Sequence, residues 1–114
     1  PGHINAFSME EPQEVLLLEK VRTMALTLQA PVFRNAQAWF FDNGLQHIQA
    51  TMGDRDFLSL IDSGIFELQP GDVLVANVRV KTLHRRDVGL VSTYEVVGVL
   101  DTRRADTDIL MPGI

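Results

Sequence analysis

The apolar side chains of this chain fall mainly into short runs that alternate with polar ones, the pattern of strands that bury one face. Residues 23–28 (TMALTL) show this alternation most clearly. Residues 15–20 (VLLLEK), directly before them, fit either a strand or a helical turn. The other extended runs that we predict are residues 37–41, 45–52, 72–83 and 93–101, with a polar loop over residues 84–92. The pattern therefore predicts a mainly β domain.

A turn signal separates the second and third of these runs, where Asp42 is followed by Asn43 and Gly44. An Asn-Gly pair accepts positive φ at both central positions of a type I′ turn, whose twist matches that of a hairpin. We therefore predict a hairpin with its turn at this point, and this is the strongest local signal in the chain.

One helix is predicted after the third strand, over about residues 54–63. Asp54 can cap it by accepting backbone N–H bonds, and Gly64 supplies a left-handed residue at its end. Apolar residues recur at helical spacing between the two. The residues expected in the core of the domain are Phe57, Ile61, Ile48, Val78 and Val96.

The order strand, strand, strand, helix, strand, strand is that of a small OB-like antiparallel barrel. An SH3-like barrel, or one helix on an open antiparallel sheet, would give a similar pattern and stays an alternative. Residues 15–103 are expected to form this single domain, with mobile segments at residues 1–14 and 104–114. The polar start, which begins with Pro1, also suggests a module cut from a longer protein.

Composition narrows the class of function. The formal net charge of −5 argues against a protein that coats duplex DNA or anionic lipid with its whole surface, while leaving room for a local basic patch. The absence of cysteine excludes disulfides, thiolate catalysis and cysteine-ligated metal sites, and it fits a cytoplasmic protein. No apolar run approaches the roughly 18 residues of a membrane span, so no membrane partner is expected.

Three aromatic residues in a row, Trp39, Phe40 and Phe41, form the first candidate binding feature. On a strand, Trp39 and Phe41 share one face and Phe40 points to the other. We expect at least two of these rings to be core. The remaining ring, which we expect to be Trp39 or Phe40, should lie near the surface that binds a partner.

The second candidate is the basic segment at residues 79–86, in which Lys81, Arg85 and Arg86 are the expected binding residues. In an OB fold, the loop between the fourth and fifth strands borders the ligand face, and guanidinium groups bind phosphate bidentately. The segment is also explained as a charged hairpin tip that keeps an edge strand soluble. An acidic protein surface and a single-stranded nucleic acid are the other occupants to consider.

The run from about residue 17 to residue 103 resembles the C-terminal region of many uncharacterised bacterial proteins, some with a GHKL-type ATPase region upstream. The residues that carry the resemblance include residues 31–33 (PVF), 39–44 (WFFDNG), 56–58 (DFL), 70–74 (PGDVL) and 94–97 (YEVV). The resemblance implies an accessory domain and carries over no catalytic residue.

No set of residues in the sequence supplies a nucleophile with a base, a phosphate-binding loop or a cage of metal ligands. We therefore expect no catalytic residue, no metal and no cofactor, and we predict that the chain is not an enzyme. The predicted function is protein interaction or assembly, including self-association through a strand edge. The alternative is an OB-type module that binds single-stranded nucleic acid through the basic loop.

Overall fold

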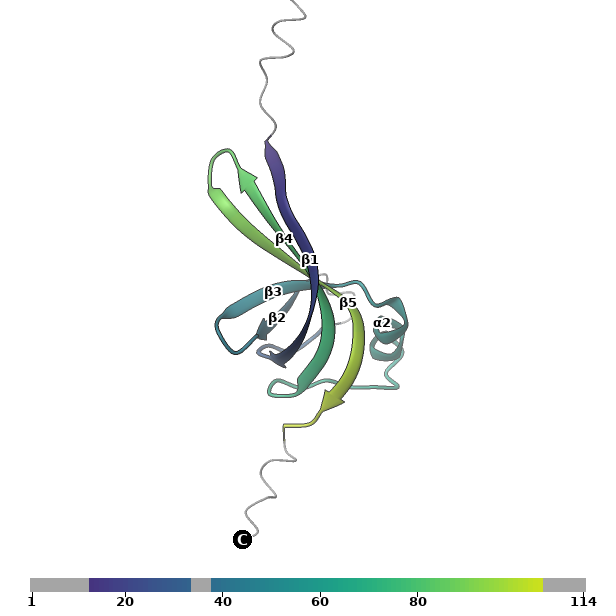
Figure 1. The fold of residues 1–114 in the computed structure, drawn as a ribbon. Coiled ribbons are helices and arrows are strands. Elements are labelled where there is room, and N and C mark those ends of the chain that lie inside the picture. Colours follow the sequence, from purple (N-terminus) through teal and green to yellow (C-terminus); the bar gives the residue numbers. More distant parts are fainter. Residues whose placement is uncertain (1–12, 34–37, 106–114) are drawn as a thin grey trace, which may run out of the picture.

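The computed structural model describes residues 13–33 and 38–105. Within them, five strands surround a small core and one helix packs against it (Figure 1). The elements are β1 (Glu14–Leu28), β2 (Trp39–Asp42), β3 (His47–Met52), α2 (Arg55–Asp62), β4 (Val73–Arg85) and β5 (Gly89–Arg103). The predicted order of strands and helix is confirmed, and the ambiguous residues 15–20 belong to β1. The predicted end segments lie largely outside the described residues.

The strands close into a barrel in the order β1, β2, β3, β5, β4, with β4 returning to β1. Closure rules out the open-sheet alternative and fits the OB-like architecture. Strands β3 and β5 run parallel to each other where residues 50–52 pair with residues 94–96. The other strand pairs of the described barrel are antiparallel. The barrel is therefore mixed rather than wholly antiparallel.

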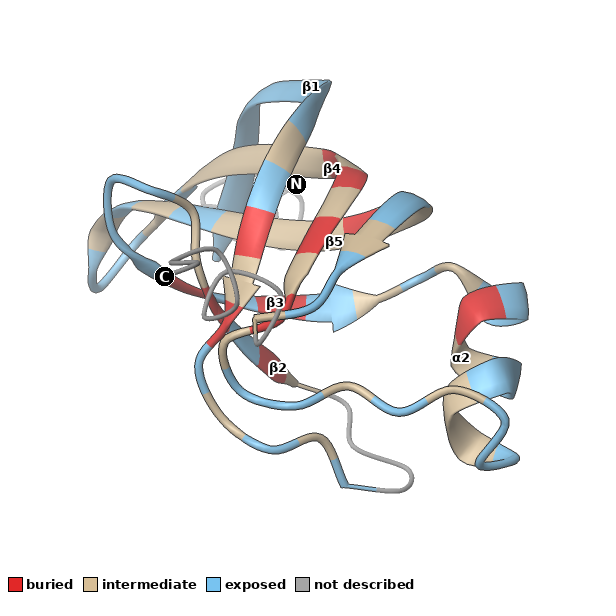
Figure 2. Ribbon diagram, turned by 90° about the horizontal axis from the view of Figure 1, so that it is seen from below, coloured by how far each residue is buried: buried red, intermediate tan, exposed pale blue. Residues whose placement is uncertain are grey.

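The core lies where alternate residues of each strand point into the barrel (Figure 2). The fully buried inward residues include Leu26 and Leu28 on β1 and Leu74, Ala76 and Val78 on β4. Of the five expected core residues, Phe57, Ile48, Val78 and Val96 are buried, and Ile61 is partly buried against the same cluster.

Helix α2 begins and ends where the sequence predicts. The Asp54 side chain accepts a hydrogen bond from the Phe57 backbone N–H at 3.0 Å, which caps the first turn. Gly64 follows the helix with φ of 80°, a left-handed conformation that favours glycine. Phe57 is the buried residue of this helix and joins it to the barrel.

The β2–β3 hairpin is confirmed, but the two-residue turn predicted for it is wrong. Asp42 pairs with His47, so four residues form the loop. Two side chains stabilise this longer loop: Asp42 accepts from the Gly44 N–H, and Asn43 accepts from the N–H groups of Leu45 and Gln46. Such side-chain bonds to nearby backbone are the reason that Asp and Asn favour turns.

The polar loop predicted over residues 84–92 is also wrong, because β4 runs to Arg85 and β5 starts at Gly89. Both strands continue beyond the barrel, and β1 accompanies them, pairing with β4 from Glu14 onward. We call this three-stranded extension the arm; it comprises residues 14–22 of β1, 79–85 of β4 and 89–93 of β5, together with the turn at residues 86–88, which forms its tip. It projects from one end of the barrel (Figure 1).

Candidate binding surface

The structure separates the two rings expected near a partner. Trp39 is only 2% exposed and packs in the core against Phe41 and Phe57, with ring centroids 6.3 and 6.5 Å away. Phe40 points outward from β2 and is 46% exposed. Phe40 is therefore the ring of this pair that a surface partner can contact.

The three predicted basic residues lie on the arm, but acidic residues of β1 and β5 offset the segment around them. Arg85 at the end of β4 bonds the Glu14 carboxylate at 2.7 Å. Arg79, in the same segment, bonds both Glu19 at 3.3 Å and Glu95 at 2.9 Å. These pairs join residues far apart in sequence, so the charge of the segment alone overstates how basic this surface is.

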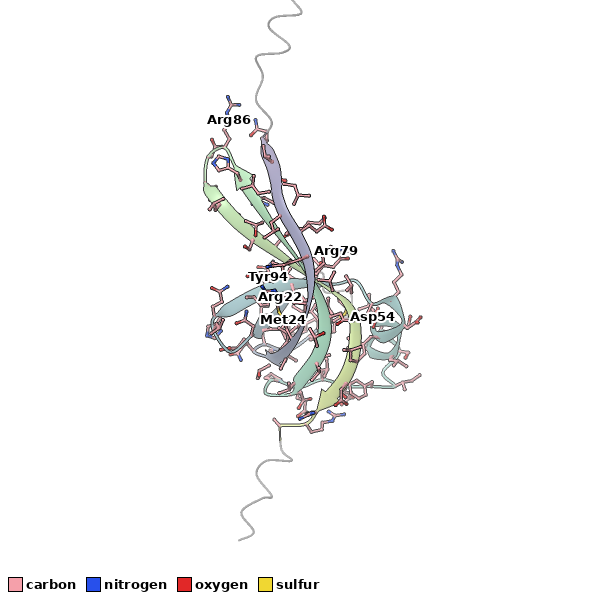
Figure 3. All side chains as sticks on the ribbon, in the orientation of Figure 1. Arg22, Met24, Asp54, Arg79, Arg86 and Tyr94 are labelled. Carbon is pink, nitrogen blue, oxygen red and sulfur yellow. The ribbon has the colours of Figure 1, made fainter. Side chains whose placement is uncertain are left out.

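Arg86 and Lys81 lie at different places on the arm. Arg86 is exposed at the tip, where its backbone N–H donates to the Gln13 carbonyl (Figure 3). Lys81 helps to line a hollow of about 190 Å³ together with Arg79, Glu95 and their neighbours. Within the described part of the chain, Lys81 has no ion-pair partner.

The arm exposes large apolar side chains on both faces and at its tip. They are Val15, Leu16, Leu17, Leu18, Val21, Val88 and Leu90, each more than two-fifths exposed. Single exposed apolar residues are ordinary on a protein surface, whereas a contiguous set marks an interaction site. The sequence pattern of residues 15–18 would suit a buried strand, yet nothing in the described chain covers it.

Within the described residues, the outer edge of β1 is unpaired along most of its length. β1 pairs with β2 only at Thr27 and Leu28. Leu28 donates its N–H to Asp72 on the β4 side, and the next residue, Gln29, donates to Phe40 of β2. The backbone hydrogen bonds of successive residues in an antiparallel strand point to opposite sides. The residues of β1 that alternate with Leu28 therefore direct their N–H and C=O groups away from β4; they include Glu19, Val21, Thr23 and Ala25. These groups have no strand beside them in the described chain.

Near the base of the arm, β5 pairs with β3 only at residues 94–96. Tyr94 is the first of these residues and is opposite Ala50 of β3. The Tyr94 hydroxyl accepts a bond from the Gln46 side chain at 3.2 Å, linking the base of the arm to the β2–β3 loop. A hollow of about 410 Å³ opens here, lined by Gln46, His47, Ile48, Gln49, Ser92 and Tyr94.

Two cations of the β1 part of the arm were not among the predicted site residues. Lys20 and Arg22 are opposite Val80 and Val78 of β4, so they share the face that continues into the barrel core. Both are exposed, and neither has an ion-pair partner in the described residues. The only sequence signal for them was their separation by one residue in a strand, which places both on one face.

Three further features of the described residues bear on function: metal ligands, membrane-spanning helices and the buried Asp72. Among the described residues, no three His, Asp or Glu side chains gather as a possible metal site. None of the helical segments described is long and apolar enough to cross a membrane. Asp72 is buried and accepts bonds from the N–H groups of Gln69 and Ala105, so its role is to fix the turn before β4 and the end of β5.

Comparison of the chain with known proteins gives no family to which it belongs. No protein-family model matches it, and neither a curated protein nor a solved structure does. The described residues define only a class of fold, a small five-stranded barrel with one helix and a projecting β arm.

Proposed function

We propose that this chain is a non-catalytic protein-interaction domain whose arm binds an extended segment of a partner protein. The observation that carries the proposal is the unpaired edge of β1 beside exposed leucines. A strand that adds to such an edge gains main-chain hydrogen bonds, and pockets for its alternate side chains provide specificity.

Protection of the edge alone does not account for the composition of the arm. Natural edge strands avoid aggregation by carrying charges, bulges and prolines. β1 has the charges, and its register with β4 shifts between Leu16 and Leu18. A purely protective strand gains nothing from exposing four apolar residues in succession, from Val15 to Leu18. A partner that covers these side chains explains both features.

The proposal also covers the kind of protein that contains this domain and the cell compartment in which it acts. The resemblance described above supports a module of a larger bacterial protein, with a role in assembly. The lack of cysteine supports a cytoplasmic location.

Single-stranded nucleic acid is the competing occupant, favoured by the exposed Phe40 ring and by Lys81, which has no ion-pair partner among the described residues. Nucleic-acid binders interleave several stacking rings with free cations. Here Arg79 and Arg85 are held by carboxylates, and other cations of the arm, Lys20, Arg22 and Lys81, are not interleaved with any exposed aromatic ring among the described residues. The balance therefore favours a protein partner.

Selection from a displayed library of random peptides tests the proposal. We expect selected peptides to bind the parent chain and to lose binding to the double variant Leu16→Lys with Leu18→Lys, whose circular dichroism should match the parent. Failure to select any peptide, or equal binding to the variant, would refute the proposal. Single-stranded DNA is titrated in parallel over a salt series, since displacement of counterions from phosphates makes such binding fall steeply with salt.

The double variant Arg85→Ala with Arg86→Ala gives a separate prediction. Its melting temperature should stay close to that of the parent, because an exposed pair such as Arg85–Glu14 contributes only about 0–1 kcal/mol. Association with a selected peptide should slow at low salt, since charges at the border of an interface mainly affect the association rate. Stopped-flow measurements provide the rate, with Arg55→Ala on α2 as the control. An unchanged rate would assign the basic tip to solubility alone.

A further inference from the structure

We infer that the β1 edge selects a strand with two carboxylates at alternate positions, flanked by apolar residues. This inference rests on the proposed function and specifies the chemistry of the partner. Its basis is the side chains that β1 places next to its unpaired backbone groups.

The unpaired backbone groups and the selecting side chains belong to alternate residues of β1. Glu19, Val21, Thr23 and Ala25 offer backbone N–H and C=O groups to an added strand, as the hydrogen bonds around Leu28 and Gln29 show. Residues between them point their side chains to the inner face of the arm. A side chain of the added strand that is directly opposite such a residue lies on the same face.

On this inner face the two central residues are the cations Lys20 and Arg22. Both are exposed and have no ion-pair partner in the described chain, unlike Arg79 and Arg85. Opposite charges that face each other across two strands are stabilising. Carboxylates two residues apart on an added strand would meet both cations at once, and a guanidinium binds a carboxylate bidentately.

The next inner-face residues on either side are apolar. Leu18 lies on one side of the cations and is 49% exposed, while Met24 lies on the other and packs partly against the core. The complementary strand therefore has seven residues. Its first and seventh residues are apolar, its third and fifth are acidic, and the residues between them can be of any type. The intervening residues lie on the outer face, opposite residues such as Val21.

A second copy of β1 is a poor occupant of this edge. A symmetric pair of edges must run antiparallel. If the unpaired N–H and C=O groups of the two copies bond to each other, the inner-face residues of one copy are directly opposite the inner-face residues of the other. Any such register centred on residues 20–22 places Lys20 or Arg22 opposite a cation of the other copy. Like charges directly opposite are destabilising.

A designed heptapeptide with blocked ends is the probe for this inference. It carries valine at its first and last positions, glutamate at the third and fifth, and threonine elsewhere. Binding to the parent chain should move the backbone amide signals of Glu19, Val21, Thr23 and Ala25 in NMR spectra. The variant Lys20→Glu with Arg22→Glu should weaken binding by about tenfold or more, given the size of cross-strand charge interactions.

Charge exchange distinguishes pairing at this edge from general attraction. A peptide with lysines in place of the glutamates should bind the double variant better than the parent. Arg55→Glu reverses a charge on α2, outside the arm, and it should leave affinity for the acidic peptide nearly unchanged.

Equal binding of the acidic peptide to parent and double variant would overturn the inference, as would amide shifts confined to other elements. If peptides selected from the library bind the arm but show no alternate acidic residues, this inference fails while the proposed function stands. If the β1 amides respond to single-stranded DNA and not to any peptide, both fail.

Discussion

Phe57→Ala should lower the free energy of unfolding by roughly 3–5 kcal/mol, the range for truncating a buried phenylalanine. Phe57 is 8% exposed and is the buried residue of α2. Its ring lies 6.5 Å from that of Trp39 and 5.8 Å from that of Phe66, so its loss leaves a cavity between helix and barrel. This cost is a large share of the roughly 5–15 kcal/mol that stabilises a typical domain.

Chemical denaturation of the two proteins measures this difference. Phe40→Ala provides a matched control, because it removes the same side chain from a position that is 46% exposed. We expect the control to cost about 1 kcal/mol or less. A shift of one degree or less in the melting temperature of the Phe57 variant would contradict the packing of α2 described here.

The elements that could be predicted from the sequence are those with strong local signals. Asp54 and Gly64 mark the ends of the helix, and both take the conformations expected of them. The Asn43-Gly44 pair located the hairpin, although not its length. The fold class followed because the order of these elements is compatible with few small architectures.

The arm could not be predicted in this way, because it depends on pairing between distant residues. Its β1 segment pairs with β4 residues more than 50 positions later, as in Arg22 with Val78. The sequence shows residues 84–92 as a polar turn region, since local patterns do not reveal that a third strand extends the hairpin. Element boundaries are set here by long-range pairing rather than by propensity.

The candidate site was only partly predictable for the same reason. Arg85 looked like a free cation until the fold placed Glu14 beside it. For Lys20 and Arg22 the sequence gives no signal beyond their alternate spacing in a strand. Their exposure beside an unpaired edge emerged only once β2 was seen to end at Asp42, opposite Thr27.

Asp54 joins α2 to the barrel, and this gives the second large effect that we expect. Its two carboxylate oxygens accept from different elements: Oδ1 from the Phe57 N–H at 3.0 Å, and Oδ2 from the Val99 N–H of β5 at 2.8 Å. Asp54→Asn should cost roughly 1–3 kcal/mol at neutral pH, because the amide supplies one oxygen and directs its NH₂ group at the second donor.

The same carboxylate should make part of the stability depend on pH. The backbone hydrogen bond from Val99, followed by that from Phe57, lowers the pKa of Asp54 below its ordinary value of 3.8, while desolvation acts in the opposite direction. A pKa lower in the folded than in the unfolded chain means that the contribution is present above pH 3.8. It is lost as the pH falls further, through the folded pKa.

The difference in unfolding free energy between the parent and Asp54→Asn should therefore be largest at neutral pH and shrink as the pH falls below 3.8. Urea unfolding of both proteins over a pH series measures it. Asp56→Asn is the control, since Asp56 lies in the same first turn of α2 and accepts no bond from Val99. If the difference stayed constant down to acid pH, the charge of Asp54 would not be what holds α2 against β5, and the oxygen geometry alone would account for the link.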